Sequence, residues 1–147
     1  MKCGLLSLFL CLLLLGGKAQ MPDEPALKEF EAFWKKLYTA IIKKDYSAVS
    51  QYIEFPLVVK ENLADTSVQI IHKEEFSKFF NIYLALPTAE TFPNKYELLR
   101  ARKSLTDDDL ALLSDDSATI GDFEFQKIDG EWKLVYLYAT DAPSAIF

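Results

Sequence analysis

The sequence predicts an α+β domain in which helices pack against an antiparallel sheet. Asp129-Gly130 separates two runs of alternating residues, which is typical of a two-residue β-hairpin because a type I′ turn requires positive φ angles that Asp and Gly tolerate. Apolar residues between positions 26 and 44 recur at three- and four-residue steps, the period of one helix face. Because an isolated hairpin is only marginally stable in water, we expect helices to cover it.

The predicted register of the hairpin gathers aromatic side chains on one face of the sheet. With the turn at Asp129-Gly130, Phe123 faces Tyr136, and Lys127 lies opposite Trp132 for a cation–π contact. The face expected to be rich in aromatic residues carries Phe123, Phe125, Trp132, Tyr136 and Tyr138. The opposite face is expected to carry Asp122, Glu124, Val135 and Leu137. Acidic groups and tyrosine phenols are therefore expected on opposite faces.

A long amphipathic helix over residues 26–44 opens the predicted domain, with Phe30, Trp34 and Tyr38 on its inner face. Asp45 is a good N-cap for a short second helix that starts at Tyr46. Pro56 disfavours helix at the residue before it, so an extended segment is expected there.

The middle of the chain is expected to contain two strands and a third helix. Residues 57–59 and 67–71 have strand composition, and apolar residues over 73–84, Phe80 among them, fall on one helix face. Between positions 87 and 117, Asn94 and Thr106 each stand where a helix N-cap would. The composition of those segments also suits strands that complete the sheet, so the sequence leaves both alternatives open.

The N-terminal segment has the features of a secretory signal peptide. Lys2 precedes an apolar run, and small residues then precede a cleavage position after Ala19. The apolar run is shorter than the roughly 20 residues of a membrane-spanning helix. We expect a signal peptide at 1–19, a flexible leader at 20–25, the folded domain at 26–140 and a tail at 141–147. A retained membrane anchor and a lipoprotein at Cys11 are the alternatives.

Removal of this segment would leave a secreted or periplasmic protein with no stable membrane span. Both cysteines, Cys3 and Cys11, would be lost, so disulfides and thiol chemistry are not expected. Half of the residues are hydrophobic and 14% are aromatic, enough for a core without disulfides. The net charge of −6 argues against nucleic acid and anionic membranes as partners.

Signatures of catalysis and of metal binding are weak. His72 is the only histidine and a weak acid–base candidate, but its position before the 73–84 helix predicts that it caps or borders that helix. One histidine excludes a His-rich metal site. The acidic runs at 107–109 and 115–116 lack the alternating oxygen ligands of an EF-hand loop. We therefore expect no metal site and no cofactor.

The order of elements resembles the NTF2-like superfamily, which includes SnoaL-like and ketosteroid-isomerase-like proteins. The segments that carry the resemblance are YSAVSQYIEFPL at 46–57 and GEWKL at 130–134. The resemblance implies a curved sheet wrapped around the long helix as a cone with an internal pocket. Family members include isomerases, dehydratases, small-molecule binders and noncatalytic partner-binding domains, so the fold does not select a function.

We expect an exported, noncatalytic binding domain that uses an apolar pocket or an open sheet face. Its partner would be a small apolar ligand, a protein or a second copy of the chain. The alternative is a small-molecule isomerase or dehydratase of the ketosteroid-isomerase-like type. The residues expected in the pocket or the core are Phe30, Trp34, Tyr38, Phe80, Phe123, Phe125, Trp132, Tyr136 and Tyr138.

Overall fold

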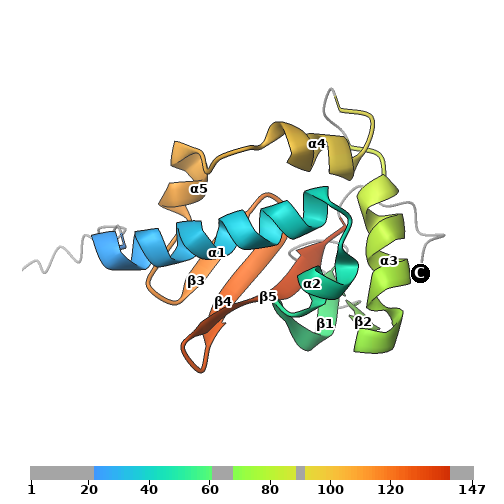
Figure 1. The fold of residues 1–147 in the computed structure, drawn as a ribbon, viewed down its shortest axis with the longest axis horizontal. Coiled ribbons are helices and arrows are strands. Elements are labelled where there is room, and N and C mark those ends of the chain that lie inside the picture. The colour runs from blue at the N-terminus through green and yellow to red at the C-terminus, as the bar shows by residue number, and fades with distance from the viewer. Residues whose placement is uncertain (1–21, 61–67, 89–91, 140–147) are drawn as a thin grey trace, which may run out of the picture.

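The computed structural model describes residues 22–60, 68–88 and 92–139, and it shows an α+β fold (Figure 1). These ranges contain five helices and one open sheet of five strands in the order β2-β1-β5-β4-β3. The helices are α1 (Glu24–Ile42), α2 (Tyr46–Ser50), α3 (Lys73–Ala85), α4 (Lys95–Ala101) and α5 (Asp107–Ala111). The strands are β1 (Ile53–Lys60), β2 (Val68–Ile71), β3 (Ser117–Ile120), β4 (Phe123–Ile128) and β5 (Glu131–Tyr138).

Two features of the expected architecture are wrong. The sheet is mixed, because β1 and β5 pair in parallel. The other three strand pairs of the sheet are antiparallel. The described helices are also more numerous than the three expected, because the stretch that suited either state forms α4 and α5. The parallel pairing joins strands that are far apart in the sequence, so the alternation within each strand does not predict it.

Polar side chains cap the starts of α2, α4 and α5, as the sequence predicted. Asp45 accepts from the amide of Ala48 at 3.0 Å, and Asn94 accepts from the amide of Glu97 at 2.9 Å. Thr106 and Asp109 form a reciprocal capping box at the start of α5. The first helix begins at Glu24, two residues earlier than expected, because Asp23 caps it and a proline fits its first turn.

The hairpin at Asp129-Gly130 is confirmed, with φ angles of 51° and 83° at these two residues. Its register is regular only as far as Phe125, which faces Leu134 as expected. A bulge then shifts the ladder, so that Glu124 pairs with Tyr136. The predicted pairing of Phe123 with Tyr136 is wrong, because the extra residue on β5 turns each later side chain to the opposite face.

A second tight turn, which the sequence analysis does not predict, lies at the other end of β4. Gly121 has a φ of 56°, which an L side chain rarely adopts, and it starts the turn that joins β3 to β4. The dipeptide Gly121-Asp122 consists of residue types that are typical of turns, so the sequence does contain a signal for this turn. Residues 117–139 therefore form a three-strand meander instead of one hairpin.

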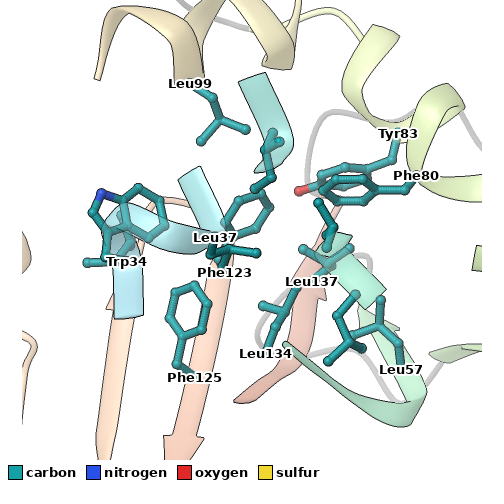
Figure 2. Packing of buried hydrophobic residues seen from close by; sticks show 14 of the residues in the cluster. Trp34, Leu37, Leu57, Phe80, Tyr83, Leu99, Phe123, Phe125, Leu134 and Leu137 are labelled. Atoms are coloured by element: carbon teal, nitrogen blue, oxygen red, sulfur yellow. The ribbon is translucent and has the colours of Figure 1, made fainter. Parts of the chain in front are cut away.

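The core lies between the sheet and the helices that cover one of its faces (Figures 1 and 2). Phe30 of α1 meets Phe125 and Trp132 with ring centroids 5.6 and 4.8 Å apart. Phe80 of α3 packs on the same face against Phe123, at 6.4 Å. These rings bury a large apolar area and hold the helices on the sheet.

The described ranges contain no helix with the length and apolar character needed to cross a membrane. The predicted signal peptide at 1–19 and the predicted tail at 141–147 lie outside the described residues.

Candidate functional site

Six of the aromatic residues predicted to form a pocket or the core lie in one buried cluster under the helices. They are Phe30, Trp34, Phe80, Phe123, Phe125 and Trp132. Tyr38 is half-buried at the margin of this cluster, and its hydroxyl donates to the carbonyl of Arg100 at 3.1 Å. Tyr136 and Tyr138 are separated from the cluster, because the bulge in β5 turns them to the outer face of the sheet.

A pocket between α3, α4 and the β3–β4 turn reaches the aromatic cluster but is very small. It has a volume of about 30 Å³ and is lined by Tyr83, Lys95 and Asp122 among others. Such a volume is about the share of one water molecule in the liquid. Pockets for small-molecule ligands have volumes of roughly 300 to 1,000 Å³. This pocket is therefore too small for a ligand the size of a metabolite.

The charged groups at this small pocket are paired with one another. Lys95, only 3% exposed, forms an ion pair with Asp122. Tyr83 donates to the carbonyl of Tyr138 at 2.9 Å. Burial raises the pKa of Tyr83 well above its usual 10, and the charge of Asp122 raises it further. Tyr83 is thus a neutral hydrogen-bond donor at physiological pH.

Another carboxylate, that of Asp109, is buried and is engaged in the same way. Arg102 donates to it at 2.7 Å, and the amide of Thr106 donates to it at 2.8 Å. A carboxylate held by a cation and by capping hydrogen bonds stabilises the helix start and is poorly placed to take a proton from a substrate. The acidic run at 107–109 therefore has a structural explanation in the first turn of α5.

His72 borders α3, as the sequence suggested, and is exposed. It stands at the N-cap position, but its side chain makes no capping hydrogen bond. The described part of the chain contains no group of three or more His, Cys, Asp or Glu side chains that is able to hold a metal ion.

The outer face of the sheet brings together phenols and a carboxylate, so the expectation that these groups lie on opposite faces is wrong. Tyr138 donates to Glu124 Oε2 at 2.6 Å. Lys60 Nζ lies 3.6 Å from the ring centroid of Tyr136 and 5.6 Å from that of Tyr138. Burial, and then the hydrogen bond to Glu124, raise the pKa of Tyr138 to about 12.

Apolar residues extend this group across β1 and β2. Val58 pairs with Ile70 on one side and with Tyr136 on the other, and the next row aligns Val68, Lys60 and Tyr138. Val68 and Ile70 are 48% and 43% exposed. We call these two rows the sheet-face patch: Val58, Lys60, Val68, Ile70, Tyr136 and Tyr138.

The residues of the expected open face are largely different from those of the sheet-face patch. Leu137 was expected there but is fully buried in the core, opposite Phe123. Val135, at the bulge, is only 9% exposed. The sequence of β1 and β2 does contain a signal for the patch. Val58 and Ile70 lie next to residues that face the core, and successive side chains of a strand point to opposite faces of the sheet. Their proximity to Tyr136 required the parallel pairing of β1 with β5.

No family model, no curated protein and no solved structure matches this chain.

Proposed function

We propose that this chain is a noncatalytic protein-binding domain and that the sheet-face patch is its binding surface. The observation that carries the proposal is the continuity of exposed Val68 and Ile70 with Val58 and Tyr136 across three paired strands. Contiguous apolar surface of this kind, rimmed by polar groups, marks interaction sites in soluble proteins. The five helices of the described ranges pack against the opposite face or lie beyond its edges (Figure 1).

The chemistry of the patch selects the kind of partner. Lys60 stands in its centre, half-buried, with its ammonium group over the Tyr136 ring and with no ion-pair partner in residues 22–60, 68–88 and 92–139. A partner that covers the patch removes water from this cation, which costs free energy unless an acidic group replaces the water. The proposed partner is therefore a protein segment with apolar side chains and a carboxylate between them.

Two other functions have less support. An apolar ligand inside the domain would need far more space than the 30 Å³ beside the aromatic cluster. An isomerase or dehydratase would need a free acid or base at that place. Asp122, which lines that pocket, is paired with Lys95, and the buried carboxylate of Asp109 is paired with Arg102.

An NTF2-like architecture and export remain part of the proposal. The order of the elements, the long α1 packed across the sheet and the open sheet covered on one face support that architecture. The apolar segment before Ala19 supports export.

The test begins by selecting peptides from a random displayed library on the purified chain, and then measures their affinity for three variants. Ile70→Asp and Lys60→Glu change the patch. Ile82→Asp is the matched control, because Ile82 is a similarly exposed aliphatic residue, at 41%, on α3. We expect selected peptides to combine an acidic residue with apolar neighbours, and to lose about tenfold or more in affinity for the two patch variants only.

Peptides without an acidic residue, or peptides that bind Ile70→Asp as well as the wild type, would contradict the proposal. Light scattering on the same proteins tests the other occupant, a second copy of the chain. If the wild type is a dimer and Ile70→Asp is a monomer, the partner of the patch is a second copy of the chain and not the proposed protein segment.

A further inference from the structure

A groove of about 340 Å³ lies on the side of α1 that faces residues 103–105, away from the sheet-face patch. Its lining includes Glu31, Trp34, Lys35, Tyr38, Lys103 and Leu105. We propose that this groove binds a small organic anion, a carboxylate with a flat apolar body, and that the indole N–H of Trp34 donates a hydrogen bond to it. This inference goes beyond the proposed protein-binding function and is independent of it.

The first observation is an unused hydrogen-bond donor. Trp34 is 3% exposed, and its Nε1 has no acceptor among the described residues. Figure 2 shows the ring nitrogen on the side turned away from Phe125 and Leu37, so the carbon edge of the ring faces the core. Buried donors in native proteins are almost always satisfied, and an indole N–H can only donate. In this proposal, a ligand in the groove that Trp34 lines supplies the missing acceptor.

Trp132 has the same unsatisfied donor as Trp34 but does not lie at the groove. Its Nε1 also lacks an acceptor in the described ranges, and its side chain is 4% exposed. Trp132 packs against Phe30 and Phe33, and it does not line the groove. An unsatisfied indole alone thus indicates no site. The side chain of Trp34, in contrast, both carries an unsatisfied donor and lines a groove that a ligand can enter.

The second observation is the charge at the groove. Lys35 on α1 and Lys103 beyond α4 line it from its two sides, and both are exposed. Two ammonium groups and an indole donor together favour an anionic acceptor over a neutral one. Glu31 lines the groove one helical turn before Lys35 and repels an anion there, so the carboxylate is expected beside the lysines.

The third observation is a flat apolar wall of suitable size. The rings of Trp34 and Tyr38 lie with centroids 6.2 Å apart and planes inclined by 40°, and Leu105 adds apolar surface. The hydroxyl of Tyr38 is occupied by the carbonyl of Arg100, which holds that ring in place. The volume lies within the roughly 300 to 1,000 Å³ of ligand pockets. An aromatic or cyclic body of one or two rings suits this wall.

The experiment follows the two indole N–H resonances of the ¹⁵N-labelled chain during titration with 2-naphthoate. The sequence has only two tryptophans, and Trp34→Phe identifies which resonance belongs to which ring. We expect the Trp34 resonance to shift in a saturable manner and the Trp132 resonance to stay in place. The uncharged amide, 2-naphthamide, is expected to bind about tenfold more weakly, because it lacks the charge that the lysines attract.

Variants test the cationic side of the groove. Lys35→Gln combined with Lys103→Gln should weaken 2-naphthoate binding by about five- to tenfold, the scale of two exposed charge contacts. Lys36→Gln is the control, because Lys36 is an exposed neighbour on α1 that does not line this groove. The proposal is overturned if the Trp34 resonance shows no saturable shift, if the amide binds as well as the carboxylate, or if the double variant binds like Lys36→Gln.

Discussion

The hydroxyl of Tyr138 donates to the carboxylate of Glu124 at 2.6 Å, across the two strands that the Asp129-Gly130 turn joins. The contact exists because the bulge in β5 turns Tyr138 to the outer face of the sheet, where Glu124 already lies by its alternation with Phe123 and Phe125. It anchors the rim of the sheet-face patch, since the Tyr138 ring is the neighbour of Lys60 in the same row. The same contact makes the stability of the domain sensitive to alkaline pH.

Tyr138 should lose its proton only near pH 12 in the folded chain. Its folded pKa lies above the unfolded value of about 10, so the neutral phenol favours the folded state. The contribution of Tyr138 to the free energy of unfolding is therefore complete below pH 10 and is lost as the pH rises toward 12. Urea denaturation across this range, compared with Tyr138→Phe, measures the contribution.

Replacement of Glu124 by a neutral residue separates the effect of its charge on Tyr138 from the effect of burial. Glu124→Gln should lower the pKa of Tyr138 toward 10, because it removes the charge that opposes the phenolate. Glu54→Gln, at an exposed carboxylate on β1, is the control and should leave the pKa of Tyr138 unchanged. Absorbance titration of the phenolates detects the difference, and equal titration curves for the two variants would contradict this assignment.

Elements set by neighbouring residues were predictable from the sequence. The turn at Asp129-Gly130, the caps at Asp45 and Asn94 and the helical period of α1 all depend on residues within one or two turns of chain. Physical signals of this range are present in the sequence itself, because turn geometry and helix capping require particular residue types.

Features that depend on distant pairing were not predictable. The alternation around Tyr136 is identical with or without a bulge, so the sequence alone did not show which face this ring would occupy. The parallel contact of Val58 with Tyr136 joins positions that are far apart in the sequence and creates the sheet-face patch. The groove at Trp34 depends likewise on how residues 103–105 return to α1.

Truncation of Phe125 should be among the most damaging changes to the core. Its ring is fully buried and meets the rings of Phe30, Phe33 and Trp34 at 5.5 to 6.0 Å. We expect Phe125→Ala to lower the free energy of unfolding by about 3 to 5 kcal/mol, since it removes buried area and leaves a cavity. Phe125→Leu should cost less than half as much in urea denaturation. A loss below 1 kcal/mol for Phe125→Ala would show that the ring is not central to the core.

Removal of the α5 cap should have a smaller and more specific effect. Thr106 Oγ1 accepts from the amide of Asp109 at 3.2 Å and donates to its carboxylate at 2.9 Å. Thr106→Ala should lower the free energy of unfolding by about 1 kcal/mol, the usual cost of losing an N-cap. Thr106→Ser keeps the hydroxyl and should retain most of the stability. Equal losses in the two variants would assign the effect to the methyl group.

The Lys95–Asp122 pair should respond unequally to the loss of either partner. The side chain of Lys95 is 4% exposed, whereas that of Asp122 is 31% exposed. Asp122→Asn leaves a cation without a counter-ion in the interior and should cost about 3 kcal/mol of unfolding free energy. Lys95→Met leaves a carboxylate that water can reach, and should cost about 1 kcal/mol.

The double variant decides whether this inequality comes from the stranded charge. Lys95→Met combined with Asp122→Asn leaves no buried ion at this site, so its free energy of unfolding should lie close to that of Lys95→Met alone. The second substitution should thus cost little once the first is present, a coupling that urea denaturation of the four proteins measures directly. Additive losses would mean that Lys95 and Asp122 stabilise the fold through separate contacts, and that burial of the ammonium group is not what makes Asp122 necessary.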